Sequence, residues 1–456
     1  MLVAALGCSA APTLPRLQPL ADTPKTVPVV LVPGISGTAL RDRATGETVW
    51  GEGRNVLTPW DGGYRLARSI HLGPGERDAL EPAGVIEELR VAGLARKSVY
   101  GPLPEMLEAH GYRRGDLAVK EPRGSLFLFA YDWRDDNLLA ARLLARRLEA
   151  LAAARDASDD DPLEVDLICQ SNGAHICRYL LKYGDVSLDD AEAGRGRPLT
   201  AVRVRKLLLV GTSNGGGLRL LREIDRGRRY VPLVGRRILP ETLFTLPALF
   251  QDLPAHETHP FVDRDGRRLA IDLFDAEAWV HHGWSVFDDA TRARLDEIAR
   301  PDLFGTETER IAYLGRVLER AERLHRLLAR DVDIAPTRIY LLQNGYEPTP
   351  HLAVVTSDGN LLFTGDRELD DTPYLDALIS QPGDGHATLE SQHALSPSER
   401  ALLAADPFLV QDRHFELILH PGTLRRILDF LLDEPSPENA AAIPSDIAPP
   451  ITTTQR

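Results

Sequence analysis

The sequence has few cysteines and no long uncharged apolar run. Only three of its 456 residues are cysteines, Cys8, Cys169 and Cys177, so it does not predict a fold held by a disulfide framework. A membrane-spanning helix needs about 18 or more apolar residues in a row. No stretch of that kind occurs, so no spanning helix is expected.

An excess of basic charge is also lacking. The chain has 53 Lys and Arg residues against 67 Asp and Glu residues, for a formal net charge of −14. A groove that binds nucleic acid needs a basic face, so we expect no nucleic-acid partner. Apolar residues make up 43% of the chain, which is enough to build a sizeable core and argues against global disorder.

The N-terminus, residues 1–27, is predicted to be a leader and tether. Its first eight residues, MLVAALGC, resemble the end of a bacterial lipoprotein signal, in which the cysteine is lipidated after cleavage, although a basic start is missing. Residues 9–27 are rich in Pro, Ala and Thr, as tethers are. We therefore expect lipidation of Cys8 and an exported protein that is lipid-anchored, periplasmic or secreted. The alternative is an apolar terminus with a buried thiol.

Short apolar segments alternate with helical patterns along much of the chain. This alternation predicts an α/β fold, with a mostly parallel central sheet flanked by helices. Strands are expected at 27–32, 125–131, 163–169, 204–210, 338–343 and 352–355. Helices are expected at 138–155, after the turn at 171–173 as far as 183, and at about 423–432. The predicted α/β core comprises 28–217 and 336–433 and includes a lid-like segment at 50–123. Residues 218–335 are predicted to be a cap insertion, and residues 434–456 a disordered tail.

The segment VDLICQSNGAHICRYLLKYG, residues 165–184, carries the clearest chemical signal. A strand runs into a sharp turn with Ser171 at its apex, and a helix follows, as in the nucleophile elbow usually written G-x-S-x-G. Cys169 fills the first glycine position and is small enough for the turn. The competing interpretation is that Ser171 only caps the helix.

Cys169 and Cys177 lie eight residues apart, one in the predicted strand and one in the predicted helix. This separation lacks the spacing of metal ligands. We expect both to be small buried packing residues. Neither a metal nor a cofactor is implied by the sequence.

Six further segments, in the same order along the chain, resemble motifs of the lecithin:cholesterol acyltransferase-like family of lipases and acyltransferases. They are PVVLVPGISGTAL at 28–40, VWG at 49–51, YDWR at 131–134, GTSNGGG at 211–217, GDGHAT at 383–388 and RHFELILHPGTLRRILDFLL at 413–432. Ser213 replaces a proline of the family pattern, and 383–388 stands against a G-D-G-T-V-P loop. The resemblance covers about 28–432, with 218–335 matched only loosely, and implies an α/β-hydrolase fold.

A serine nucleophile needs a base, and the base needs a carboxylate that holds its tautomer. The resemblance assigns the acid to Asp384 and the base to His414, in the chain order Ser, acid, His of this fold. Asp358 and Asp366 are rival acids, but their surroundings, TSDGN and TGDRE, are typical of turns. His420 is the rival base, and His386 and His393 are interpreted as loop residues.

The oxyanion hole is expected from two backbone N–H groups. One belongs to Asn172, directly after the serine, and the other to Ile35 in the loop at 33–37. Ile35 follows the first strand, although the loop could also be a tight turn alone.

The resemblance implies a serine-dependent lipid ester hydrolase or O-acyltransferase that works through an acyl-enzyme. Its partners would be a lipid or other ester and a membrane or lipid interface, with lids at 50–75 and 218–290. Trp50, Trp60, Tyr64, Trp279 and Trp284 are candidate interface aromatics, or ordinary packing residues. The alternatives are a peptidase, thioesterase or other esterase on the same scaffold, and a surface lipoprotein that binds lipid without catalysis.

Overall fold

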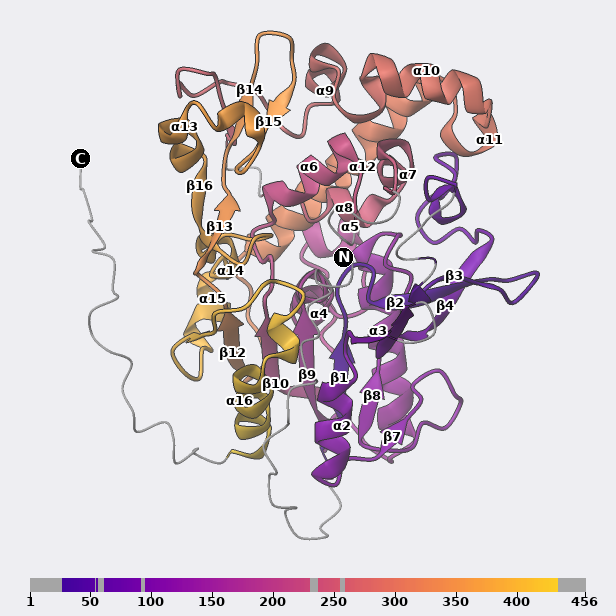
Figure 1. Cartoon of the computed structure of the whole chain (residues 1–456). Helices are drawn as coiled ribbons and strands as arrows, with labels where there is room; N and C mark the ends of the chain where they lie inside the picture. The colour runs from indigo at the N-terminus through magenta and orange to yellow at the C-terminus, as the bar shows by residue number, and fades with distance from the viewer. Residues whose placement is uncertain are drawn as a thin grey trace.

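A seven-stranded sheet forms the centre of the protein (Figure 1). The computed structural model describes residues 27–53, 55, 61–91, 95–229, 237–254 and 259–433. The strand order is β17-β12-β10-β9-β1-β8-β7, and each neighbouring pair is parallel. In chain order the strands are β1 (Val29–Val32), β7 (Arg114–Gly115), β8 (Leu126–Leu128), β9 (Leu163–Gln170), β10 (Val202–Val210), β12 (Arg338–Gln343) and β17 (Phe408–Leu409).

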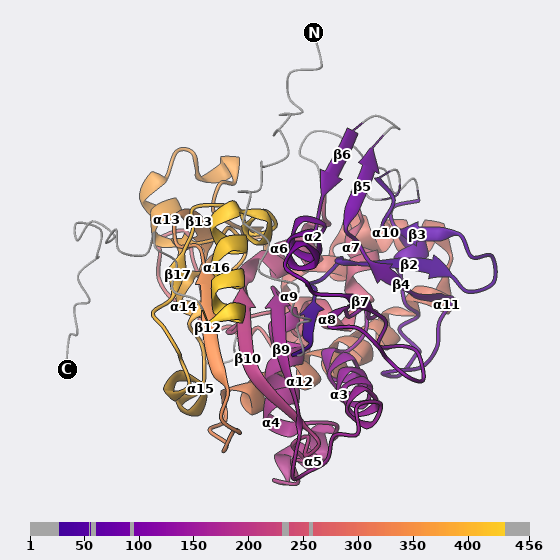
Figure 2. The ribbon, with the colours of Figure 1, turned by 90° about the horizontal axis from the view of Figure 1, so that it is seen from below.

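Helices cover both faces of this sheet, as Figure 2 shows from below. On β1, Val30 and Val32 face the side of α3 (Asn137–Ala153), α4 (Gly173–Tyr183) and α12 (Glu307–Ala329). The alternate residues Val29 and Leu31 face α2 (Pro102–Ala109) and α16 (Pro421–Leu432). Because successive side chains of a strand point to opposite faces, a continuous apolar run such as VVLV fits a strand buried on both sides.

The long helices begin where the sequence provides a cap. The carboxylate of Asp136 accepts the Leu138 N–H at the start of α3, and leucines and alanines three and four residues apart form its buried face. At the start of α12, Thr306 and Glu309 form a reciprocal capping box. Both caps satisfy N–H groups that a helix leaves without intrahelical partners.

The connection from β10 to β12 is long and mainly helical. Many of its elements gather beyond the end of the sheet where the strands finish (Figure 1). They are α6 (Leu218–Arg226), α7 (Pro240–Phe244), α8 (Pro247–Phe250), β11 (Phe261–Val262), α9 (Ala276–His282), α10 (Asp289–Ile298), α11 (Pro301–Phe304) and α12. The predicted helical insertion into an α/β fold is therefore present.

Smaller sheets and helices complete the described parts of the chain. The strand expected at 352–355 is β14 (Ala353–Val355), and it belongs to a small sheet with β11 and β15 (Leu361–Leu362) rather than to the central one. The other small sheets are β2 (Thr38–Asp42) with β3 (Thr48–Trp50) and β4 (Leu80–Val85), β5 (Glu88–Val91) with β6 (Ala95–Ser98), and β13 (Glu347–Pro350) with β16 (Ser380–Gly383). The remaining α-helices are α5 (Leu188–Glu192), α13 (Pro373–Leu378), α14 (Leu389–Gln392) and α15 (Pro397–Ala401).

Within the described residues, none of the helices combines the length and the hydropathy that a membrane span requires. The parallel sheet with helices on both faces confirms the predicted α/β fold class.

Candidate active site

Ser171 stands at a sharp turn between β9 and α4. Its φ is 52°, in the left-handed region that non-glycine residues rarely adopt, and its N–H donates to the carbonyl of Val210 at 3.2 Å. The start of α4 also lies close to the neighbouring strand β1, because a Cβ added at Gly173 would lie 2.6 Å from the carbonyl oxygen of Val32. The geometry is that of a nucleophile elbow, which places the hydroxyl at the end of the strand.

His414 and Asp384 meet this serine in space. The Nε2 atom of His414 lies 2.8 Å from the Ser171 Oγ, and its Nδ1 lies 2.6 Å from the Asp384 Oδ2. The other carboxylate oxygen, Oδ1, accepts the backbone N–H groups of His386 at 2.9 Å and Ala387 at 2.8 Å. The structure therefore brings together the three residues that the sequence predicts as a triad.

The rival histidines have other partners. The His420 ring accepts the Gly422 N–H at 3.0 Å and caps α16. The Nε2 of His393 lies 2.5 Å from the Gln343 side-chain oxygen. Neither ring is the one bonded to the serine hydroxyl.

The rival aspartates also have structural surroundings. Each carboxylate oxygen of Asp366 pairs with an arginine: Oδ1 with Arg222 and Oδ2 with Arg226, both at 2.7 Å. Asp358 lies in a turn and accepts the Asn360 side-chain amide at 2.6 Å. Both arrangements favour roles in folding rather than in the bonding of an imidazole.

The imidazole of His414 is tuned by two opposing effects. Burial disfavours its charged form, but the charge of the adjacent Asp384 carboxylate and their hydrogen bond outweigh burial, so the pKa of His414 lies above its ordinary 6.5. The carboxylate also holds the proton on Nδ1, which leaves Nε2 free to accept the serine proton.

A pH–rate profile should reflect this raised pKa. An imidazole can act as a general base only when it is neutral, and a raised pKa keeps it protonated up to a higher pH. We therefore expect kcat/KM to fall about tenfold per pH unit below an inflection that lies above pH 6.5. The profile should be measured with folding checked at each pH. An inflection well below 6.5 in the folded protein would contradict the assignment of His414 as base.

Two backbone N–H groups are available beside the serine. Neither the Ile35 amide nor the Asn172 amide donates to another backbone group in the described parts of the chain. Asn172 precedes the first turn of α4, where the positive end of the helix dipole favours a developing negative charge. The two predicted oxyanion residues thus occupy the loop after β1 and the helix start that flank the serine.

Side chains brace the loop that carries Ile35. The Tyr131 hydroxyl donates to the Pro33 carbonyl at 2.9 Å, and the Gln170 side-chain oxygen accepts the Gly34 N–H at 3.2 Å. The Tyr100 hydroxyl bonds to the same Gln170 oxygen at 2.7 Å. Burial raises the pKa of Tyr131, so this hydroxyl stays a neutral donor. The sequence hinted at Gln170 only by its place next to the serine.

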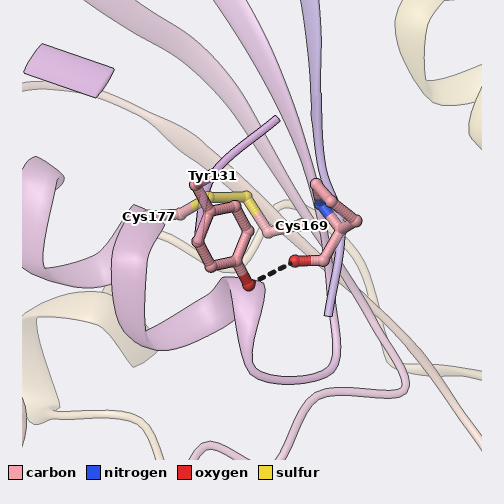
Figure 3. The surroundings of a disulfide bond; sticks show 4 residues. Tyr131, Cys169 and Cys177 are labelled. Atoms are coloured by element: carbon pink, nitrogen blue, oxygen red, sulfur yellow. Dashed lines mark hydrogen bonds between the residues drawn. A yellow bond between two sulfur atoms is a disulfide. The ribbon is translucent and has the colours of Figure 1, made fainter. Parts of the chain in front are cut away.

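Cys169 and Cys177 form a disulfide (Figure 3), which corrects the expectation that they are packing thiols. Both are fully buried, as expected. The elbow reverses the chain so sharply that residues separated by 8 positions, one on β9 and one on α4, have their Cα atoms 6.7 Å apart. The Tyr131 ring lies beside the bond (Figure 3). The disulfide therefore closes a short loop that contains Ser171.

Removal of this bond should cost stability. For a loop this short, the loss of chain restraint predicts that Cys169→Ala/Cys177→Ala unfolds with a free energy about 2–3 kcal/mol lower than the native chain. Urea denaturation under oxidising conditions measures the difference. Reductant should destabilise the native chain and leave the double variant unchanged. A native chain as stable with reductant as without it would contradict the prediction.

The candidate interface aromatics are mostly packing residues. Trp50, Trp279 and Trp284 are at most 2% exposed, and their ring N–H groups donate to the carbonyls of Ser36, Leu273 and Gly359. The half-buried Tyr64 donates its hydroxyl to Glu241 at 2.9 Å. Trp60 lies outside the described residues, as does Cys8. The three buried tryptophans are therefore unavailable to a lipid surface.

No group of three or more His, Cys, Asp or Glu side chains arranged to hold a metal occurs among the residues that the structure describes.

The residue that sequence reasoning overlooked is His386, interpreted as a loop residue. Its ring stacks on that of His414, with centroids 4.3 Å apart. Only its position two residues after Asp384 could have pointed to this contact.

Comparison with known proteins identifies the fold. No protein-family model matches the sequence, and no curated protein matches it. The crystal structure of the Tle4-Tli4 complex contains a chain of similar fold, with a TM-score of 0.53 and 12% sequence identity. The match covers 90% of this chain and 99% of that one. With the parallel sheet and the elbow, this likeness shows that the chain has the α/β-hydrolase fold.

Proposed function

We propose that the protein is a serine-dependent ester hydrolase or acyltransferase with Ser171, His414 and Asp384 as its catalytic triad. The observation that carries the proposal is the unbroken pair of hydrogen bonds, 2.8 Å and 2.6 Å long, from serine hydroxyl to imidazole to carboxylate. Such a chain activates a hydroxyl that is otherwise a weak nucleophile. The elbow holds the hydroxyl at the turn within reach of the imidazole, and the two free amides would provide electrostatic stabilisation.

The geometry indicates how the reaction would proceed. The Ser171 Oγ attacks the ester carbonyl while its proton passes to the His414 Nε2. The amides of Ile35 and Asn172 donate to the oxyanion of the tetrahedral intermediate. The leaving alcohol takes the proton from His414, and an acyl-enzyme remains. His414 then removes a proton from water, which gives hydrolysis, or from a second alcohol, which gives acyl transfer.

A lipid ester is the substrate class that the motif resemblance favours. The proposed lids, 50–75 and 218–290, contact each other in their described parts, because Leu239 donates its N–H to the Gly62 carbonyl at 3.0 Å. Phe415, next to the base in sequence, is 43% exposed and offers an apolar surface beside the ring of His414, with centroids 5.2 Å apart. Two lid segments in contact and an exposed apolar ring beside the base would suit an acyl chain that must leave water.

The experiment combines a serine-directed fluorophosphonate probe with product analysis on phospholipid vesicles, with and without a sterol. Labelling of the peptide that contains Ser171, with release of fatty acid, supports a lipase. A steryl ester in the second arm supports an acyltransferase. Labelling without lipid turnover favours another esterase or a thioesterase. A folded protein that is not labelled contradicts the proposal and favours the non-catalytic lipid-binding alternative.

Export is a further part of the proposal. Lipidation of Cys8 would anchor the chain outside the cytoplasm, and disulfides persist mainly in oxidising compartments, which suits the bond between Cys169 and Cys177. Mass analysis of the N-terminal peptide from the membrane and cytosolic fractions tests this. An unmodified Cys8 in a purely cytosolic protein would contradict it.

A further inference from the structure

The imidazole of His414 is covered on one face by a second imidazole. The rings of His386 and His414 are nearly parallel, with an interplanar angle of 16° and centroids 4.3 Å apart. Phe415 meets both rings edge-on, with centroids 4.9 Å from His386 and 5.2 Å from His414. The base is therefore held at its edge by Ser171 and Asp384 and against a flat surface on its face.

The same loop provides the carboxylate and the covering ring. His386 follows Asp384 by two residues, and its backbone N–H donates to the Asp384 Oδ1 at 2.9 Å. The intervening Gly385 donates to the Thr349 hydroxyl at 2.9 Å. Backbone also packs tightly against the loop, since a Cβ at Gly217 would lie 2.4 Å from the His386 carbonyl oxygen. A shift of this loop would therefore move the Asp384 carboxylate and the His386 ring together.

We propose that His386 is a positioning residue for the general base, a neutral aromatic plate that fixes the ring plane of His414 and favours its positive charge during the reaction. The hydrogen bonds to Asp384 and Ser171 both lie at the edge of the imidazole and leave it free to tilt about the line that joins them. Stacking on a second ring removes that freedom, and offset-stacked aromatic pairs are attractive. The inference rests on the proposed triad.

The charged surroundings keep this plate neutral. Burial lowers the pKa of His386 well below its ordinary value, and the positive charges of His414, Arg219 and Arg228 lower it further. Glu223 balances these arginines only in part, because Arg219 and Arg228 both pair with it, at 3.1 Å and 3.3 Å.

The neutral state decides whether the stack helps or opposes catalysis. A neutral ring face attracts a cation placed against it, as aromatic faces generally do. A second imidazolium would repel it. The negative groups that favour a charged His414 are Asp384 and Asp252, whose charges both raise its pKa. During turnover, the neutral ring of His386 would thus stabilise the positive charge on His414 without taking up the proton itself.

The histidine at position 386 is not part of the family motif that this loop resembles. In the G-D-G-T-V-P loop that 383–388 resembles, a threonine stands where this sequence has His386. A threonine lacks an aromatic face. The positioning role therefore belongs to His386 as it stands here and does not follow from the resemblance.

The test compares His386→Ala, which removes the plate, with His386→Phe, which keeps an aromatic face that never carries charge. We expect His386→Ala to lower kcat roughly 3- to 10-fold with KM little changed, and His386→Phe to keep most of the native kcat. The proton NMR signal of the His414 Nδ1–H, bonded to Asp384, should stay sharp in the Phe variant and broaden in the Ala variant. His351→Ala, at a half-buried position between β13 and β14 and outside both proposed lids, is the matched control and should resemble the native enzyme.

A His386→Ala variant with native kcat and a sharp Nδ1–H signal would overturn the inference. So would a folded His386→Phe variant as impaired as His386→Ala, because that result would assign a polar rather than a stacking role. Either outcome leaves the proposed triad intact if Ser171 of the native chain still reacts with the fluorophosphonate. Failure of that reaction in the native chain would instead contradict the proposed function.

Discussion

Ser171→Ala should remove nearly all ester turnover. Loss of one member of a triad that acts as a unit lowers the rate by about 10⁴- to 10⁶-fold, because only binding and the oxyanion amides remain. The alanine should keep the elbow, since the Ser171 N–H bond to Val210 involves only backbone. Steady-state hydrolysis of a chromogenic ester, normalised to folded protein, measures the loss.

Ser285 provides a matched control for this substitution. It is also a buried serine with a left-handed backbone, at φ 60°, and its hydroxyl donates to the carbonyl of Ile224. Ser285→Ala should therefore test the effect of an alanine at positive φ, with a stability cost of about 1 kcal/mol from the lost hydrogen bond and native turnover. If Ser171→Ala retained turnover while folded, another nucleophile would have to act.

The parts of the site predicted from sequence have local signals. The elbow depends on a strand, a small-residue turn and a helix that are contiguous in the chain, so its pattern is visible in residues 163–183. The caps of the long helices and the alternation of strands with helices are local for the same reason. The distant acid and base, Asp384 and His414, have weaker local signals, and the motif resemblance assigned them.

The remaining features depend on contacts between distant segments or on how sharply the chain turns. The disulfide could not be predicted from spacing alone, because it requires the reversal of direction at Ser171 that brings β9 against α4. The tryptophans were ambiguous, because an aromatic ring suits both a core and an interface. Their burial in the fold and the acceptors of their N–H groups identify three of them as packing residues. The stack of His386 on His414 joins two loops whose approach depends on the whole fold.

Asp384→Asn should lower turnover about 10⁴-fold, the size of loss that a serine protease suffers when its triad aspartate becomes asparagine. The structure gives the reason. The Oδ1 atom accepts two backbone N–H groups, from His386 and Ala387, so the asparagine oxygen should remain at that position. Its NH₂ group would then face the Nδ1 of His414 and donate to it. The imidazole proton would move to Nε2, which could no longer accept the proton of Ser171.

The same substitution at the two rival aspartates completes this prediction. Asp366→Asn weakens the ion pairs with Arg222 and Arg226, so it should lower the free energy of unfolding by about 1–3 kcal/mol and leave kcat per folded molecule unchanged. Asp358→Asn, in an exposed turn, should change neither quantity appreciably. Unfolding curves and kcat of all three variants, measured under one set of conditions, separate the two kinds of effect. Full activity in Asp384→Asn together with loss of kcat in folded Asp366→Asn would show that the loop at 383–388 is only a turn, and that the bond from Asp384 to His414 is not the one that supports the base.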